Sequence, residues 1–264
     1  MDDDITLYIA GMKSQSLVDE PGHAVAMIYL QGCNLDCGFC HNSSLIPMFT
    51  KKSKKSTIAQ LLEKLADNFL IDGVVFTGGE PLLQGPNLLH FVQALAEKYT
   101  FIGIDTNGTN PVMIAKLSPH VTRFAMDIKA SFENYENVVR KSVDVEKIKE
   151  SIEILCQRSR ESGRVEFRMV YAPPVVSLDD VMAVADHLAA SNFSSNFKSC
   201  FVIQQYMPSD GVREDLRKSF QTLTVDQLEI IAKNVKTYGI PVAIRCQERG
   251  YFEVQLDNEQ VNPR

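Results

Sequence analysis

The residues most able to do chemistry in this chain are three cysteines in one short stretch. Cys33, Cys37 and Cys40 are spaced C-x3-C-x2-C and follow the apolar run of residues 24–30. That run predicts a buried strand, with a Gln-Gly joint leading to the cysteines. The spacing therefore places three thiols on a loop at the carboxyl end of a strand, where α/β proteins usually carry their chemistry.

Three thiolates on one loop indicate a metal centre, and several metals stay open. A structural zinc ion is normally closed by four ligands, and a [4Fe-4S] cluster bound only by protein also takes four cysteines. His41 is a candidate fourth zinc ligand, but it adjoins Cys40, so both side chains reach one ion with difficulty. A cluster on three cysteines keeps one iron open for a small molecule. The other cysteines lie in unrelated apolar segments, where small buried residues are the favoured interpretation: Cys156, Cys200 and Cys246.

Further motifs follow the other predicted strands. Two glycines in Thr77-Gly78-Gly79-Glu80-Pro81 allow the backbone to approach a ligand, although an ordinary turn has the same composition. The Asn-Gly pair within 105–108 is most often a turn. Asp127 and Lys129 are also explained by a salt bridge. Arg168 lies within a strand, where a charge is costly unless it is paired.

Alternating strand and helix signals supply the scaffold for these motifs. Six strands are predicted, at 24–30, 73–76, 101–104, 121–126, 165–171 and 200–203. Helices are predicted at 57–69, with Ser56 as N-cap, and at 86–99, 111–117, 145–157 and 177–190. This order predicts an α/β protein with a mostly parallel, curved sheet and right-handed crossovers. Six units are too few for a full barrel, so we expect an open, partial (βα)6 barrel.

The pattern changes after Met207. Thr224-Val225-Asp226-Gln227 has the form of a capping box for a helix to residue 238, and 241–245 and 251–254 are candidate strands. We expect residues 1–207 to form the barrel and residues 208–264 to form an extension packed on it, within one structural unit. An edge-covering role is favoured over a substrate lid, because a long unpaired edge strand needs cover.

Composition argues against several classes of protein. The chain has 264 residues, 45% hydrophobic and 23% charged, as expected of one domain with a large core. A formal net charge of −6 gives no reason to expect binding to nucleic acid or membranes. No window of ~20 apolar residues predicts a membrane span, and the acidic start Met1-Asp2-Asp3-Asp4 is unlike a signal peptide. The cysteine usage favours a reducing cytoplasm.

The cysteine motif, with Phe39 before its last cysteine, resembles the signature of the radical S-adenosylmethionine (SAM) enzymes. The run from Ser16-Leu17-Val18-Asp19-Glu20-Pro21-Gly22 through Gln31-Gly32-Cys33-Asn34 to Cys40-His41-Asn42 is similar to the glycyl-radical-activating enzymes. Among these, which include pyruvate formate-lyase activating enzyme, the chain is most similar to activating proteins of anaerobic ribonucleoside-triphosphate reductase, over about residues 9–207. The resemblance implies a six-unit partial barrel.

This resemblance implies cofactors, a reaction and partners. Cys33, Cys37 and Cys40 would hold a [4Fe-4S] cluster whose open iron binds SAM. Reductive cleavage of SAM would give methionine and a 5′-deoxyadenosyl radical, which takes the α-hydrogen of a glycine in a partner protein. That partner would be a glycyl-radical enzyme, with anaerobic ribonucleotide reductase the favoured one. A low-potential donor such as flavodoxin or ferredoxin would supply the electron.

The resemblance also implies roles for the strand-end residues. The Gly78-Gly79-Glu80 turn would hold the SAM amino group, and Phe39 would pack by the adenine. Asp105 and Asn107 would lie beside the methionyl and ribose groups. The remaining polar residues would contact the ribose hydroxyls and the SAM carboxylate: Asp127, Lys129 and Arg168.

Two other interpretations stay open. One is a radical SAM enzyme acting on a small molecule or peptide, as in a 7-carboxy-7-deazaguanine synthase-like rearrangement or an epimerisation. The other is a zinc-binding structural protein, which is disfavoured because the glycine and acidic motifs fall at successive strand ends. The basic run Lys51-Lys52-Ser53-Lys54-Lys55 would flank the barrel mouth, where a solvated polar loop is favoured over a docking patch for an acidic partner.

Overall fold

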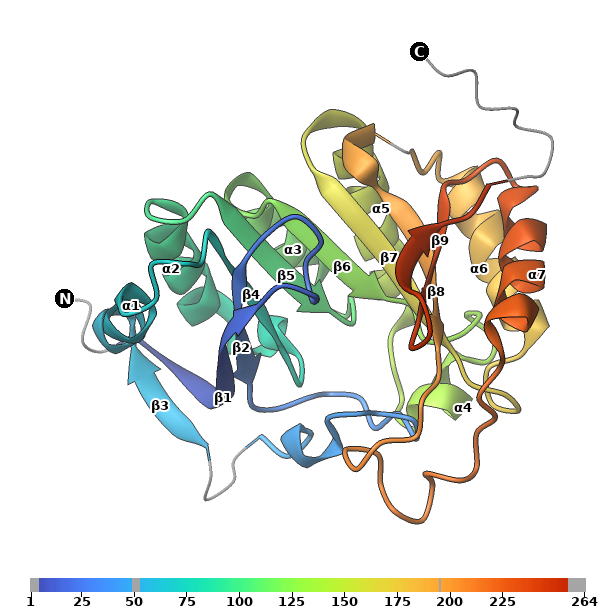
Figure 1. The fold of residues 1–264 in the computed structure, drawn as a ribbon, viewed down its shortest axis with the longest axis horizontal. Coiled ribbons are helices and arrows are strands. Elements are labelled where there is room, and N and C mark those ends of the chain that lie inside the picture. The colour runs from blue at the N-terminus through green and yellow to red at the C-terminus, as the bar shows by residue number, and fades with distance from the viewer. Residues whose placement is uncertain (1–4, 49–52, 195, 256–264) are drawn as a thin grey trace.

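One strongly curved sheet dominates the computed structural model, which describes residues 5–48, 53–194 and 196–255 (Figure 1). Its described strands are β1 (Thr6–Ser16), β2 (Val25–Leu30), β3 (Lys54–Thr57), β4 (Gly73–Gly78), β5 (Phe101–Thr106), β6 (Arg123–Asp127), β7 (Arg164–Tyr171), β8 (Cys200–Gln205), β9 (Val242–Cys246) and β10 (Gly250–Glu253). They are ordered β10-β9-β8-β7-β6-β5-β4-β2-β1-β3. From β2 to β9 neighbouring strands are parallel, and antiparallel strands complete the two edges.

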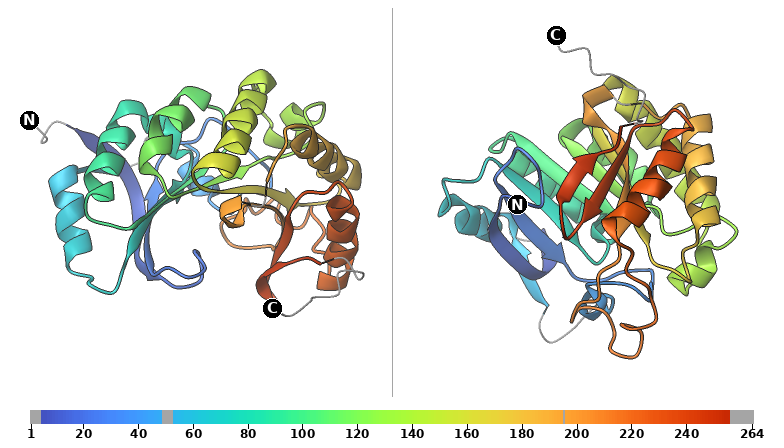
Figure 2. Two further views of the ribbon diagram at one scale, coloured as in Figure 1. Left: turned by 90° about the horizontal axis from the view of Figure 1, so that it is seen from above. Right: turned by 45° about the vertical axis from the view of Figure 1, so that its right-hand side comes forward.

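Helices cover the convex face of this sheet. The described α-helices are α1 (Ile58–Ala66), α2 (Gly85–Ala96), α3 (Pro111–Leu117), α4 (Tyr135–Val139), α5 (Val145–Glu161), α6 (Leu178–Ala190) and α7 (Val225–Lys236). Figure 2 shows that the two ends of the sheet do not meet, so the barrel is partial. Within the described ranges, no helix combines the length and the apolar character needed to cross a membrane.

Alternation along the central strands separates an apolar face from a charged one. Phe124 and Met126 of β6 and Phe167 of β7 are fully buried in the core formed with the helices. Their neighbours Asp127 and Arg168 point to the concave face, since successive side chains of a strand alternate. The fold thus collects charged groups on the inside of the curve, where burial requires them to pair.

The predicted fold class is confirmed. The six predicted strands correspond to β2, β4, β5, β6, β7 and β8. Thr224 and Gln227 form the predicted capping box at the start of α7. β9 then pairs in parallel with β8, so the segment expected as an appendage continues the sheet by one more strand. The division into residues 1–207 and 208–264 stays a prediction.

Predictions for the edge of the sheet were wrong in detail. The run predicted as a polar loop becomes strand at Lys54 and Lys55, which start β3, whereas residues 51–52 lie outside the described part. Thr57, and not Ser56, caps α1, because β3 continues to Thr57 and its hydroxyl accepts from Gln60 N. Strand β1 was not predicted, because its half-exposed residues lack a strict apolar alternation. Helix α4 was missed because it is only five residues long.

Candidate active site

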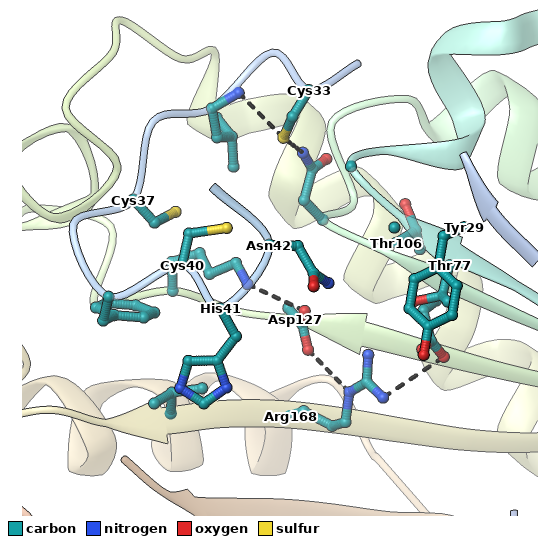
Figure 3. Close-up of a pocket in the computed structure, with 18 of the residues that line it drawn as sticks. Tyr29, Cys33, Cys37, Cys40, His41, Asn42, Thr77, Thr106, Asp127 and Arg168 are labelled. Atoms are coloured by element: carbon teal, nitrogen blue, oxygen red, sulfur yellow. Dashed lines mark hydrogen bonds and ion pairs between the residues drawn. The ribbon is translucent and has the colours of Figure 1, made fainter. Parts of the chain in front are cut away.

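A cavity of about 320 Å³ lies on the concave face, at the carboxyl ends of the parallel strands. Its walls come from the cysteine loop, from the ends of β2, β4, β5, β6 and β7, and from β8 and β9. Figure 3 shows these side chains converging from loop and strands on one space. Its chemically active lining includes Cys33, Cys37, Cys40, Asp105, Asp127, Lys129 and Arg168.

Backbone hydrogen bonds hold the cysteine loop, residues 33–43, at this cavity. Cys33 N donates to Ile46 O at 3.0 Å, and Asp36 N donates to Val139 O at 2.9 Å, which ties the loop to the end of α4. Figure 3 shows the sulfur atoms of Cys33, Cys37 and Cys40 facing a common space. The structure therefore brings together the three thiols that the sequence singled out.

The environment of these thiols does not activate them as nucleophiles. Burial raises the pKa of Cys33 to about 12 and that of Cys37 to about 11, and it also raises the pKa of Cys40. A nucleophilic cysteine has a lowered pKa. Buried thiols of this kind ionise when a metal binds, because the thiolate is the ligand. Among the residues that the structure describes, no three His, Cys, Asp or Glu side chains are positioned to hold a single metal ion.

The Gly78-Gly79 turn packs directly against the end of β2 and against Gly32, just before the cysteine loop. A Cβ at Gly78 would lie 2.5 Å from Leu30 N, and one at Gly79 would overlap the carbonyl oxygen of Gly32. Gly79 N donates to Leu30 O at 2.9 Å and Glu80 N donates to Gly32 O at 2.7 Å. These two N–H groups bind the chain itself, so the reason for glycine is the close approach of two backbones at the edge of the cavity.

Glu80 is only 1% exposed and does not line the cavity. Its Oε1 accepts from Leu82 N at 3.0 Å and from Thr106 Oγ1 at 2.8 Å, and its Oε2 accepts from Asn107 N at 2.6 Å. Burial raises the pKa of Glu80 to about 7, although these three hydrogen bonds favour the carboxylate. The side chain therefore fastens the end of β5 to the Gly78-Gly79 turn.

A chain of ion pairs crosses the cavity wall from β5 to the residues after β6. Arg168 Nε lies 2.8 Å from Asp127 Oδ1, and its Nη1 lies 3.5 Å from Asp105 Oδ1. Lys129 Nζ lies 3.0 Å from Asp127 Oδ2. Arg123 Nη1 lies 2.5 Å from Asp105 Oδ1. Asp127, Lys129 and Arg168 therefore form salt bridges and also line the cavity, so the two explanations of these residues are compatible (Figure 3).

These pairs set the charge states of the two carboxyl groups. Burial alone would raise the pKa of Asp105, but Arg168 and Arg123 outweigh it and hold that pKa well below its ordinary value. The pKa of Asp127 is lowered as well, because Arg168 and Lys129 outweigh burial. Both groups are therefore carboxylates at neutral pH, and Arg168 is oriented by two of them.

Asn107 and Phe39 complete the predicted lining. Asn107 Nδ2 donates to Asn34 Oδ1 at 2.9 Å and lies 4.0 Å from Cys33 Sγ, so it bridges the β5 end and the cysteine loop. Phe39 is 4% exposed and reaches the cavity. The structure thus places all the predicted site residues at the cavity wall, except Glu80, which lies behind it.

Several lining residues were not predicted as site residues. Asp19, Tyr29 and Arg245 also line the cavity. Arg245 lies in β9, and the signal that drew attention to Arg168, a charge inside a predicted strand, was also present there. Tyr29 lies within an apolar run of the sequence. Only the alternation of side chains between the two faces of the strand would have indicated that it points to the concave face.

Comparisons with known proteins identify the class of this fold and site. The model of the radical SAM superfamily matches residues 27–192, which include the cysteine loop and the first five parallel strands. The chain therefore belongs to the radical SAM superfamily.

Individual relatives show to which members of the superfamily this chain is similar. A protein of Methanocaldococcus jannaschii, MJ1227, provisionally named as a glycyl-radical enzyme activating enzyme, is 30% identical over 93% of this chain and 98% of its own length. The pyruvate formate-lyase-activating enzyme of Clostridium pasteurianum is 32% identical over 46% of this chain and 52% of its own. QueE from Escherichia coli has the same fold, with a TM-score of 0.59 at 15% identity, over 93% of this chain and 96% of that chain.

The residues at the cavity fit the cofactors of this family, a [4Fe-4S] cluster and SAM. Cys33, Cys37 and Cys40 offer the three thiolates of such a cluster, on a loop without a fourth cysteine. Lys129 and Arg168 offer cationic donors, and Asp127 offers acceptor oxygens, beside the same space. These groups match the carboxylate, ammonium and ribose hydroxyls of SAM.

Proposed function

We propose that this chain is an activase that installs a glycyl radical on a partner enzyme, with anaerobic ribonucleoside-triphosphate reductase the favoured partner. The observation that carries the proposal is the alignment with MJ1227, which spans nearly all of both chains. MJ1227 is provisionally named as a glycyl-radical enzyme activating enzyme. Because it covers 93% of this chain, the match reaches beyond residues 27–192, which the superfamily model matches.

The proposal assigns roles to residues at the cavity. Cys33, Cys37 and Cys40 hold the cluster, which leaves one iron for SAM. When bound, the cluster and SAM would supply the reductive cleavage of SAM to methionine and a 5′-deoxyadenosyl radical, with the electron from a flavodoxin- or ferredoxin-like donor, and this radical would take the α-hydrogen of a glycine of the partner. SAM is positioned by Phe39, Gly78, Gly79, Asp105, Asn107, Asp127, Lys129 and Arg168.

The chain's own contribution is orientation and exclusion of water. Arg168 is fixed by Asp105 and Asp127, so its guanidinium is oriented before a ligand arrives. Phe39 adds an aromatic ring to the wall of the cavity. Glu80 acts through the backbone of Asn107, and we assign it a positioning role. All six cysteines are free thiols, which supports a reducing cytoplasm as the setting.

The test is a reaction of the anaerobically reconstituted, reduced protein with SAM and a candidate reductase. We expect about four irons per chain and a glycyl doublet in the electron paramagnetic resonance spectrum of the reductase. The matched control replaces the partner's radical-bearing glycine by alanine. SAM cleavage without a doublet from any glycyl-radical partner would refute the activase assignment, and stoichiometric zinc would refute the cluster.

A second candidate is a rearrangement of a small pterin-like molecule. It is favoured by the similarity to the 7-carboxy-7-deazaguanine synthase of Archaeoglobus fulgidus, 29% identical over 44% of this chain and 53% of that protein. SAM cleavage that is stimulated by such a substrate, with formation of 7-carboxy-7-deazaguanine, would support this candidate.

A further inference from the structure

The segment between β8 and α7 lies across the cysteine loop. We call residues 207–223 the strap, and Figure 1 shows it beside the short helix Ser43–Leu45, which directly follows the cysteine loop. Gly211 O accepts from Ser43 Oγ at 2.7 Å and from Ser43 N at 3.3 Å. A Cβ at Gly211 would overlap the carbonyl oxygen of His41. The two backbones are therefore in direct contact.

Arg213 of the strap grips the centre of the cysteine loop. Its Nη1 donates to Asp36 Oδ1 at 2.7 Å, and its Nη2 donates to Asp36 O at 3.0 Å and to Cys37 O at 3.4 Å. The other carboxylate oxygen of Asp36 lies 3.9 Å from Arg140 Nε. One planar guanidinium thus binds the side chain and two successive carbonyls of the segment that carries Cys37.

Aromatic packing continues this contact to the last cysteine. Phe220 of the strap packs edge-to-face on Phe39, with ring centroids 6.0 Å apart, and on Tyr206, with centroids 5.2 Å apart. A Cβ at Gly38 would lie 3.1 Å from Phe220 Cζ. The strap therefore covers Gly38 and packs on the ring of Phe39, between the second and third cysteines.

We propose that Arg213 is a positioning residue for the iron–sulfur cluster, which clamps the cysteine loop through the strap and places a positive charge beside the cluster. The inference rests on the proposed cluster site at Cys33, Cys37 and Cys40, but it is independent of the substrate. The extension after β8 therefore contributes to the metal centre itself.

Two physical effects follow from this placement. The guanidinium of Arg213 binds the backbone carbonyls of Asp36 and Cys37 and so restricts the motion of this segment. It would therefore slow the dissociation of Cys37 from the metal. Its positive charge favours the more negative, reduced state of a cluster, because net charge and nearby hydrogen bonds set the reduction potential.

The experiment compares four proteins after anaerobic reconstitution: wild type, Arg213→Ala, Arg213→Lys and Arg217→Ala. Arg217 is the matched control, because its guanidinium pairs with Asp210 inside the strap, at 2.9 Å. The rate of iron release to a chelator and the midpoint potential of the cluster are measured for each, after circular dichroism has shown that each is folded.

We expect Arg213→Ala to release iron about tenfold faster than wild type, since charge-assisted hydrogen bonds are lost, and to have a more negative midpoint potential. Arg213→Lys should restore the potential but not the release rate, because an ammonium cannot span the same three acceptors. Arg217→Ala should match wild type in both measurements.

Wild-type release and potential in Arg213→Ala would overturn the inference. Equal effects in the Arg217 variant would also overturn it, because they would assign the change to general loosening of the strap. A wild-type protein that holds no iron would instead refute the cysteine site itself, and the role of the strap with it.

Discussion

The Glu80→Gln variant tests whether Glu80, which follows β4, positions Asn107, which follows β5. Glu80 accepts from Leu82 N and Thr106 Oγ1 with one oxygen and from Asn107 N with the other. Glutamine keeps the volume but has a single acceptor oxygen. In either orientation of its amide, one buried backbone N–H, that of Leu82 or that of Asn107, faces an NH₂ group and loses its acceptor.

The expected cost follows from that geometry. A buried donor left without a partner costs about 1–3 kcal/mol, and the lost bond to a carboxylate is among the stronger ones. At pH 8 Glu80 is ionised, since burial raises its pKa to about 7, and a neutral amide relieves part of the cost of burying that charge. We therefore expect the free energy of unfolding to fall by only about 1 kcal/mol, at the lower end of that range. SAM affinity should fall about tenfold, because the Asn107 backbone moves away from the cavity.

Urea denaturation of the apo-protein measures the first quantity, and calorimetric titration of the reconstituted protein with SAM measures the second. Glu97→Gln is the control, because it makes the same chemical change at an exposed residue, at the end of α2. An unfolding free energy within about 0.5 kcal/mol of wild type, together with unchanged SAM affinity, would refute the role assigned to Glu80.

Three further predictions concern the loop, the charges and the turn. Cys37→Ala should abolish both cluster and SAM cleavage, whereas Cys156→Ala should retain the iron; iron analysis decides, and retained activity in the first variant would remove the cluster assignment. Burial opposes the shift, but neighbouring guanidinium groups hold the pKa of Asp105 below its ordinary 3.8, so its contribution to stability is present above that pH and lost below it. Denaturation between pH 5 and about pH 3 should show a flatter loss in Asp105→Asn than in wild type, and parallel curves would contradict this. Gly79→Ala should cost more than about 3 kcal/mol, because its Cβ overlaps a backbone oxygen, whereas Gly11→Ala, with nothing within 4 Å of its Cβ, should be nearly neutral in a thermal melt.

Much of the parallel sheet was predictable because its signals are local. Each apolar run of the central strands is bounded by turn residues, and parallel strands necessarily bring their carboxyl ends to one edge. The edge strands were harder, since β1 and β3 are half-exposed and gain their strand conformation from pairing with each other. A run such as Lys54-Lys55-Ser56-Thr57 carries no core-facing pattern that would reveal it.

The sequence by itself determined where the chemistry is: three thiols within eight residues share a loop whatever the rest of the chain does, and glycine and acidic motifs end successive strands. Only the tertiary structure decided how these parts are held. Glu80 turned away from the cavity to bind Asn107, Arg245 came to the cavity wall from β9, and Arg213 reached Asp36 across 177 positions of the chain. Such contacts depend on how curved strands and crossovers bring distant parts of the backbone together. Local periodicity in the sequence does not reveal which distant residues will meet.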